Sequence, residues 1–102
     1  MSKRIAKQEA ECFLRGVEQE KEFFVNNGPA ISNLEGLEKE LKKMKKETFS
    51  FHVNKDKNDF SAWINDVIGD KTLARNLSNT RTKETLLKRV KERVAFLKKA
   101  VK

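Results

Sequence analysis

The chain of 102 residues is long enough for one compact core, and with apolar and charged residues each at 37% it lies outside the disordered class. No apolar run approaches the roughly 18 residues that a membrane-spanning helix needs, and because acidic residues interrupt the start of the chain we expect no signal peptide. With one cysteine and one histidine, the chain can form neither an internal disulfide nor a Cys/His zinc site, and we expect no metal or cofactor. Together with the length of the chain, these observations predict a single cytoplasmic domain, residues 1–102.

The net charge of +8 is distributed unevenly along the chain. Residues 1–53 carry a net charge of +1 and residues 54–70 one of −2, whereas residues 71–102 hold 11 basic residues against two acidic ones, a net +9. Such asymmetry favours an acidic partner, which could be a protein, a nucleic acid or an anionic surface. The charge alone does not choose among them.

The N-terminal part predicts a helix followed by a hairpin. Apolar residues at helical spacing indicate a helix over about residues 2–22, although Gly16 weakens the pattern. Two short apolar runs, Phe23–Val25 and Ala30–Ile31, then flank an Asn-Asn-Gly-Pro sequence. Asn-Gly between β-prone runs indicates a hairpin, because both residues tolerate a positive φ angle. A hairpin this short must pack on helices to be stable.

The segment that begins at Ser32 is typical of a capped helix. Ser32 and Glu35 have the spacing of a capping box, and four apolar residues would then share one face. These are Leu34, Leu37, Leu41 and Met44. On the solvent side we expect Glu35 to pair with Lys39 and Glu38 to pair with Lys42.

The middle of the chain is ambiguous at first and then strongly helical. Thr48 to Val53 fits either a strand or a helical turn, and residues 54–58 predict a polar loop with Asn58 or Asp59 capping the next helix. That helix has the clearest amphipathic pattern in the chain and ends at Gly69. Its apolar stripe is Phe60, Trp63, Ile64, Val67 and Ile68, and we expect Trp63 to be a core anchor.

Two further helices complete the predicted fold. Asp70 should cap a short helix that ends at Ser78, and a final helix begins near Thr82. The apolar stripe of the final helix is Leu86, Leu87, Val90, Val94, Leu97 and Val101. The sequence therefore predicts a mainly α fold, a small helical domain of four to five helices with one short β-hairpin.

Two candidate chemical sites are weaker than their structural alternatives. His52 with Asp56 or Asp59 could form an acid–base pair, but no nucleophile or substrate cradle accompanies it. A structural histidine that bonds a loop backbone beside an aromatic cluster is the favoured interpretation.

Asn54, Asp56 and Asn58 copy part of a calcium loop, yet the required glycine and glutamate are missing. With no nucleotide-binding or hydrolase motif in the chain, we expect no enzymatic activity.

Two interpretations of the basic C-terminal helix are open: it is a binding surface, or it is a solvated surface without a binding function. Its charge imbalance exceeds what solubility requires. If phosphates are the ligand, lysine and arginine contacts would give salt-sensitive, sequence-tolerant binding. A membrane is a less suitable partner, because Phe96 is the only aromatic residue of the helix. The candidate phosphate contacts are Lys88, Arg89, Lys91, Arg93, Lys98 and Lys99.

Three blocks lie between Phe23 and about Leu77: FFVNNG, NLEGLEKEL and a longer block that contains HVN, KNDF, WI, GD and LA. Together they resemble a group of small, poorly characterised domains found chiefly in archaea and some bacteria. Phe24 stands where a tryptophan is common in that group. The resemblance carries no established activity, and it implies that the NDF-W block belongs to the scaffold.

We thus expect a helical extension over residues 1–22, a family-like core over 23–77 and a basic helix over 80–102. The leading interpretation is a non-enzymatic interaction or adaptor module whose partner is an acidic macromolecule, either protein or nucleic acid. The alternative is electrostatic, sequence-tolerant nucleic-acid binding through the basic C-terminal helix. The oligomeric state stays open.

Overall fold

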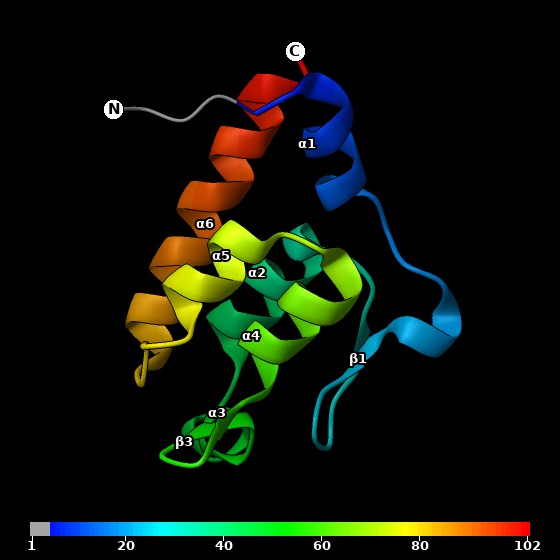
Figure 1. Cartoon of the computed structure of the whole chain (residues 1–102). Helices are drawn as coiled ribbons and strands as arrows, with labels where there is room; N and C mark the ends of the chain where they lie inside the picture. Colours follow the sequence, from blue (N-terminus) through cyan, green and yellow to red (C-terminus); the bar gives the residue numbers. More distant parts are fainter. Residues whose placement is uncertain (1–4) are drawn as a thin grey trace.

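The computed structural model describes residues 5–102 and is mainly helical, which confirms the predicted fold class (Figure 1). A 3₁₀ turn at Gln19–Lys21 precedes the first hairpin, and a π-helical turn at Ile64–Ile68 continues from α4. The α-helices are α1 (Lys7–Leu14), α2 (Leu34–Lys43), α3 (Lys46–His52), α4 (Asp59–Trp63), α5 (Lys71–Leu77) and α6 (Lys83–Ala100). The antiparallel hairpins are β1 (Phe23–Phe24) with β2 (Ala30–Ile31), and β3 (Val53–Asn54) with β4 (Lys57–Asn58).

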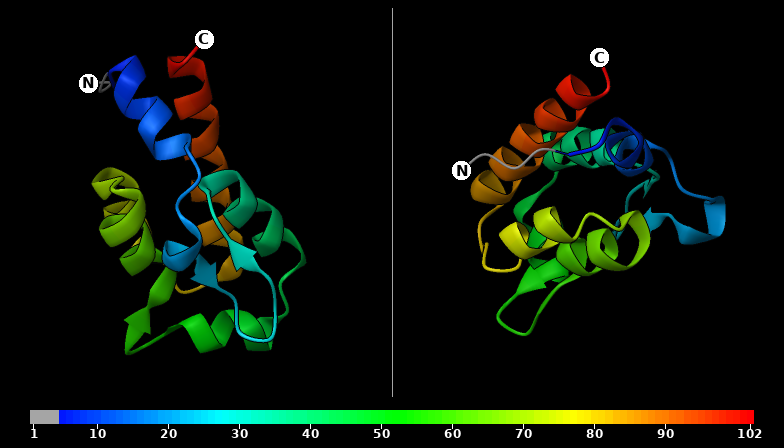
Figure 2. Two further views of the ribbon diagram at one scale, coloured as in Figure 1. Left: turned by 90° about the vertical axis from the view of Figure 1, so that its right-hand side faces the viewer. Right: turned by 45° about the horizontal axis from the view of Figure 1, so that its top comes forward.

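Helix α6 is the long element against which α1, α2 and α5 pack. Figures 1 and 2 show α1 beside the C-terminal end of α6, although the two helices lie far apart in the sequence. Four residues of the predicted apolar stripe are buried: Leu86, Val90, Val94 and Leu97. Leu87 and Val101 are only partly buried. The helix is therefore held by one face, and its opposite side is open to solvent.

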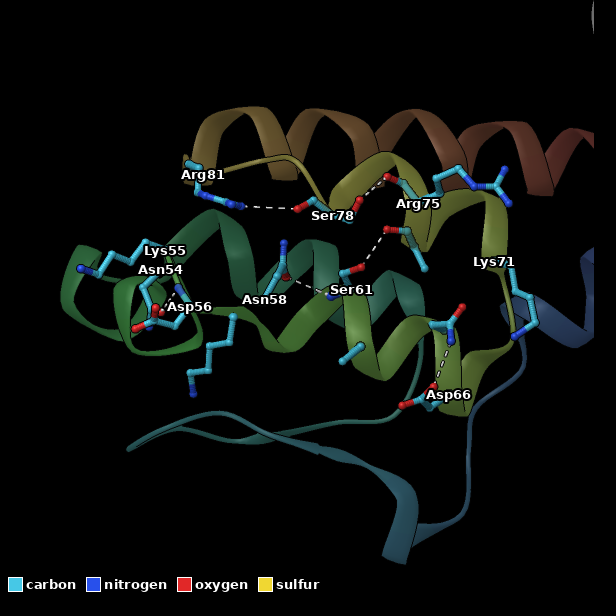
Figure 3. A pocket seen from close by; sticks show the side chains of 14 residues that line it. Asn54, Lys55, Asp56, Asn58, Ser61, Asp66, Lys71, Arg75, Ser78 and Arg81 are labelled. Atoms are coloured by element: carbon cyan, nitrogen blue, oxygen red, sulfur yellow. Dashed lines mark hydrogen bonds between the residues drawn. The ribbon is translucent and has the colours of Figure 1, made fainter.

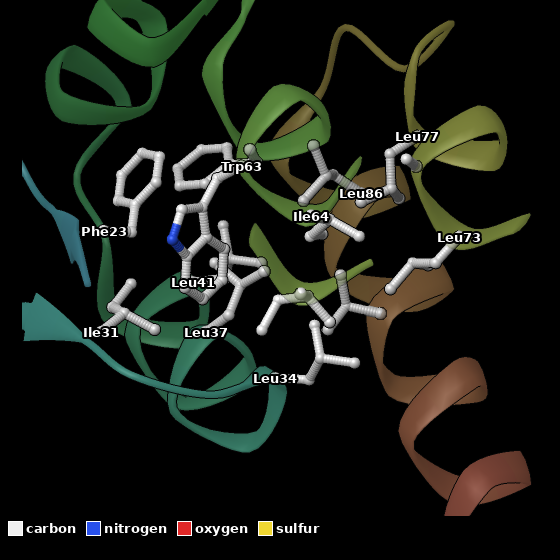
Figure 4. Packing of buried hydrophobic residues seen from close by; sticks show 14 of the residues in the cluster. Phe23, Ile31, Leu34, Leu37, Leu41, Trp63, Ile64, Leu73, Leu77 and Leu86 are labelled. Atoms are coloured by element: carbon white, nitrogen blue, oxygen red, sulfur yellow. The ribbon is translucent and has the colours of Figure 1, made fainter. Parts of the chain in front are cut away.

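Aromatic and aliphatic side chains from the helices and both hairpins form the core, part of which is drawn in Figure 4. The fully buried ring of Phe60 stacks on Phe23, with the ring centroids 4.8 Å apart. Trp63 meets Phe23 edge-on, and its Nε1 donates a hydrogen bond to the carbonyl oxygen of Lys21 at 2.8 Å. Because its polar atom has a partner, the indole can be buried without a large desolvation cost. The prediction that Trp63 is a core anchor is confirmed.

The first hairpin forms where the Asn-Gly sequence predicted it. Phe23 pairs with Ile31, and Phe24 with Ala30. In the turn it is Asn27, with a φ of 58°, that adopts the left-handed conformation. Alternation along β1 buries Phe23 and leaves Phe24 exposed. Packing of Phe23 and Ile31 in the core supplies the stability that so short a hairpin lacks by itself.

The predicted N-terminal helix is wrong at its C-terminal end. Helix α1 stops at Leu14, and Arg15 is extended, with a ψ of 147°. The backbone N–H of Val17 then donates to the carbonyl oxygen of Ser32 at 2.8 Å. This tertiary hydrogen bond replaces the helical one that continuation of α1 would have formed. Residues 2–4 of the predicted helix lie outside the described part of the chain.

Helix α2 begins one residue later than the capping-box pattern predicted. The cap is Asn33, whose Oδ1 accepts a hydrogen bond from the backbone N–H of Gly36 at 2.7 Å. Asparagine and serine stabilise a helix N-terminus to a similar extent, so which of the two is the N-cap of α2 depends on where the preceding strand ends. Glu38 pairs with Lys42 at 3.5 Å as predicted. Glu35 instead forms its ion pair across the fold, with Lys98 of α6.

The ambiguous segment and the polar loop after it form a helix and a second hairpin. Helix α3 ends at His52, and Val53 then starts β3. In the turn, Oδ1 of Asn54 accepts a hydrogen bond from the backbone N–H of Asp56 at 3.0 Å, so the side chain closes the loop. Asn58 ends β4 and caps α4, as predicted, by accepting from the N–H of Ser61 at 3.0 Å.

The two predicted boundaries after α4 are confirmed. Gly69 has a φ of 91°, a left-handed conformation that ends the helical segment and favours glycine. Asp70 caps α5 because its Oδ1 accepts from the backbone N–H of Leu73 at 3.1 Å. These two residues turn the chain so that α5 lies across both α4 and α6.

Candidate functional site

An open groove of about 640 Å³ lies between the second hairpin, α4 and α5 (Figure 3). Its lining combines charged side chains with neutral hydrogen-bonding ones, and within residues 5–102 its apolar part consists of two alanines. The lining residues are Asn54, Lys55, Asp56, Lys57, Asn58, Ser61, Ala62, Asn65, Asp66, Lys71, Ala74, Arg75, Ser78 and Arg81. Five of them are basic and two are acidic, so the groove carries a net positive charge.

Three polar contacts hold the walls of the groove together. Nδ2 of Asn58 donates to the carbonyl oxygen of Leu77 at 2.9 Å, which ties the hairpin to the C-terminal end of α5. The hydroxyl of Ser61 donates to the carbonyl oxygen of Ala74 at 2.7 Å and joins α4 to α5. The Asn58 cap on α4 is the third contact. The basic side chains are therefore mounted on elements whose relative positions are fixed.

Four groove cations are exposed and have no carboxylate partner within residues 5–102: Lys55, Lys71, Arg75 and Arg81. Arg81 does donate to the backbone carbonyl oxygens of Ser78 and Thr80, at 3.4 and 3.3 Å. The fifth cation, Lys57, is different, because its Nζ lies 2.9 Å from the Asp59 carboxylate. Four positive side chains therefore face solvent without a neutralising group.

Arg93, one of the six candidate phosphate contacts on α6, is committed to an internal partner. Its Nε and Nη2 donate to the two carboxylate oxygens of Asp70 at 2.7 and 2.9 Å. Asp70 is fully buried, and the Arg93 side chain is only 15% exposed. Because two of its donor atoms are held by a buried carboxylate, Arg93 is less suited to a phosphate than an unpaired surface cation, and we do not retain it as a phosphate contact.

Two more of the six residues are engaged on the surface. Nζ of Lys98 lies 2.6 Å from the Glu35 carboxylate, and this hydrogen bond raises the pKa of Lys98. Arg89 donates to the backbone carbonyl oxygen of Asn76 and so joins α6 to α5. Both side chains stay exposed to solvent, but each already has a partner. Their positive charge is thus less available than the sequence suggested.

The remaining three candidates, Lys88, Lys91 and Lys99, are exposed and lie on the side of α6 that faces away from its buried stripe. They are not a purely basic surface. Glu84 and Glu92 are each four residues from Lys88 in this helix, where residues at that spacing are neighbours. We call Lys88, Lys91 and Lys99 the outer face of α6.

His52 occupies the structural role that the sequence predicted. Its side chain is buried, and its Nε2 accepts a hydrogen bond from the backbone N–H of Asn26 in the first hairpin at 3.0 Å. Its Nδ1 lies 3.0 Å from Oδ2 of Asp59. The ring packs between Phe23 and Phe51, with centroid distances of 4.9 and 5.0 Å. The imidazole therefore links the first hairpin to the start of α4 and is buried beside aromatic rings.

Asp59 receives hydrogen bonds from Lys57 and His52 and lies beside the positive charge of Lys57. Partial burial alone would raise the pKa of its carboxyl group, but the two hydrogen bonds and the charge of Lys57 outweigh this effect and lower the pKa below its usual value of 3.8. A lowered pKa in the folded state stabilises the protein above the pKa of the unfolded chain. That stabilisation is lost as the pH falls through the folded-state value.

The difference in unfolding free energy between the wild type and Asp59→Asn should consequently be constant at neutral pH and shrink below about pH 4. Urea denaturation of both proteins at a series of pH values between 7 and 2 measures this difference in unfolding free energy. Lys57→Gln removes one of the stabilising partners and should weaken the same pH dependence. A difference that stays constant down to pH 2 would show that the Asp59 carboxylate has no favourable partner in the fold.

No family model, curated protein or solved structure matches this chain. Within residues 5–102, no group of three or more histidine, cysteine, aspartate or glutamate side chains could hold a metal ion. The helices of the same residues all lack the combination of length and apolarity that is needed to cross a bilayer.

Sequence reasoning missed the groove, although one signal for it was present. Lys71, Arg75 and Arg81 were counted in the basic C-terminal third but were not assigned to a surface of their own. Lys55 lies in the segment of residues 54–70, whose net charge is −2. Contacts between residues distant in the sequence bring this segment next to α5, among them the hydrogen bond between Asn58 and Leu77, which are 19 positions apart.

Proposed function

We propose that this chain is a non-enzymatic interaction module that binds an acidic macromolecule by electrostatic attraction. The observation that carries the proposal is the set of exposed cations without a carboxylate partner among residues 5–102, in the groove and on the outer face of α6. Clustered positive charge accelerates and strengthens the association with anionic partners.

The burial and the hydrogen bonds of the one histidine support a non-enzymatic role. His52 is buried among aromatic rings, and its two nitrogens bond to Asn26 and Asp59. A general base must reach the proton that it removes, and this imidazole has no free position for a substrate. The two residues that the sequence offered as an acid–base pair thus form an internal contact that fastens the hairpins to α4.

A second candidate function is sequence-tolerant nucleic-acid binding through α6. Its specific support is the exposure of Lys88, Lys91 and Lys99 on the outer face of α6. Lysine contacts to phosphates would neutralise charge without reading bases. Glu84 and Glu92 weigh against this version, because they lower the positive potential along the same face.

A titration with polyanions at two salt concentrations tests the proposed function. Fluorescence anisotropy would follow labelled duplex DNA, single-stranded DNA, RNA and polyglutamate at about 50 and 200 mM salt. We expect micromolar binding to at least one of these at the lower salt and a steep loss of affinity at the higher one. A peptide nucleic acid of the same sequence, which lacks phosphates, is the control and should not bind. If no polyanion binds at low salt, the proposed function is wrong.

A further inference from the structure

We infer that the groove between the second hairpin and α5 is a phosphate-binding track for the backbone of a nucleic-acid duplex, and that this groove, and not the outer face of α6, is the principal binding surface. The inference rests on the proposed function and adds its partner and its location. It follows from the position, the pairing and the chemical surroundings of the basic side chains.

The groove cations are placed at both of its ends. In Figure 3, Lys55 and Arg81 lie toward one end and Lys71 and Arg75 toward the other. This agrees with the hydrogen bond that holds the hairpin at the C-terminal end of α5, whereas Lys71 is the first residue of that helix. A ligand that satisfies all four cations must therefore be extended and carry several negative charges.

The dimensions suit a run of phosphates. The seven residues of α5 rise by roughly 10 Å, at 1.5 Å for each residue. Each strand of a duplex presents a phosphate about every 3.4 Å along the helix axis. A ligand that lies along α5 would thus offer several phosphates to Lys71 and Arg75, which are one helical turn apart. Lys55 and Arg81 extend the row of cations past the end of the helix.

The neutral lining also suits a phosphate backbone. Asn54, Asn65 and Ser78 bring amide and hydroxyl groups to the groove wall, and such side chains commonly bond to phosphate and sugar oxygens. The acidic residues of the lining are Asp56 and Asp66. Even with these, the positive groups outnumber the negative ones by five to two.

An acidic protein is a poorer partner for this surface. Protein interfaces depend on buried apolar and aromatic anchors that enter pockets on the partner. Among residues 5–102, the apolar part of the groove lining is Ala62 and Ala74, and neither forms a deep pocket for an anchor. Protein–DNA interfaces, in contrast, are polar, wet and strongly basic on the protein side.

A duplex is favoured over a single strand for a related reason. Proteins that bind single strands stack the bases on exposed aromatic rings. The groove lining within the described chain includes no aromatic residue. The exposed ring of Phe51 is not part of the groove lining, and Nζ of Lys57 lies 4.7 Å from its centroid. Contacts from this groove would therefore be made with the backbone and would not depend on base sequence.

Two triple variants with the same net charge test the inference. Lys55→Gln/Lys71→Gln/Arg75→Gln removes three groove cations, and Lys88→Gln/Lys91→Gln/Lys99→Gln removes the outer face of α6. Each reduces the net charge of +8 by three, so a general loss of attraction affects both equally. All six side chains are exposed, and circular dichroism with thermal unfolding would verify that both variants fold as the wild type does.

The measurement is the affinity for an 18-base-pair DNA duplex as a function of salt. With four phosphate contacts the wild type should show a slope of log K against log salt of about −3.6, which is a loss on the order of 100-fold between 50 and 200 mM. The groove variant should retain a slope of only about −0.9, whereas the α6 variant should change the slope by less than about 1.

The other outcomes separate the inference from the proposed function. A greater effect of the α6 variant, or tighter binding of single-stranded DNA than of the duplex, would overturn the inference while leaving an anion-binding module. Binding of polyglutamate without binding of duplex would also overturn it and would favour an acidic protein partner. Failure of the wild type to bind any of these polyanions would overturn both.

Discussion

Replacing Arg93 with alanine should lower the free energy of unfolding by about 3–5 kcal/mol, because the change leaves a buried carboxylate without its counter-charge. Asp70 is fully buried, and Arg93 contacts both of its oxygens. The same carboxylate caps α5 through the backbone N–H of Leu73. The loss would therefore affect the contact between α5 and α6 as well as the start of α5.

Urea denaturation of Arg93→Ala and of Lys88→Ala, a matched control on the same helix, checks this prediction. Lys88 is exposed and its substitution should stay within about 0.5 kcal/mol of the wild type. Adding Asp70→Asn to Arg93→Ala should recover part of the stability, because asparagine keeps a cap acceptor and removes the buried charge. If Arg93→Ala were as mild as Lys88→Ala, Arg93 would be a surface cation after all and would return to the candidate phosphate contacts.

Replacing Phe60 with alanine should cost about 3–5 kcal/mol as well, for a different reason. Its ring is fully buried at the meeting point of Phe23, Phe49 and His52, with centroid distances of 4.8, 6.1 and 5.3 Å. Removing the ring leaves a cavity between the first hairpin, α3 and α4, and elements this short have little capacity to move into the space. The aromatic contacts add to the burial of apolar surface.

The matched control for Phe60→Ala is Phe51→Ala, which removes the same atoms from a ring that is 50% exposed. That substitution should cost less than about 1 kcal/mol, because only its contacts with His52 and Lys57 are lost. Denaturation midpoints of both variants, taken with the slopes of the transitions, give the comparison. Equal effects would contradict the packing described for the aromatic cluster.

The block from His52 to Ala74 is made largely of residues with internal partners. His52 links the first hairpin to α4, Asn58 caps α4 and holds α5, and Trp63 bonds to Lys21. The last part of the block includes Asp70, which holds Arg93. These contacts explain the block as scaffold. The cations of the proposed track lie in the gaps between these residues and at the edge of the block.

The number of basic residues in the C-terminal third overstates the number of cations that a ligand can bind. Of the six cations proposed on α6, Arg93, Lys98 and Arg89 have partners elsewhere in the fold. Those partners are Asp70, Glu35 and the backbone of Asn76, which lie up to 63 positions away along the chain. A cation is less available to a ligand where the fold has already supplied a carboxylate, as it has for Arg93 and Lys98.

Local physical chemistry made much of the fold readable from the sequence alone. The stripe of Leu86, Val90, Val94 and Leu97 has helical spacing, the turn at Asn27 requires a residue that tolerates positive φ, and Gly69 ends a helix in the left-handed conformation. Each of these depends on residues within a few positions of one another. Helical periodicity, turn conformation and capping are short-range effects, so they can be inferred without knowing what the segment packs against.

The tertiary structure decided what depends on residues distant in the sequence. Helix α1 ends at Leu14, and Val17 bonds to the carbonyl oxygen of Ser32 where a longer helix would bond to its own backbone; the helix before Val53 places His52 against the first hairpin. The hydrogen bonds from Asn58 to Leu77 and from Ser61 to Ala74 hold the walls of the groove together. Concentrated basic charge was visible in the sequence. Which of these cations face a common surface was not, because long-range hydrogen bonds and ion pairs determine it.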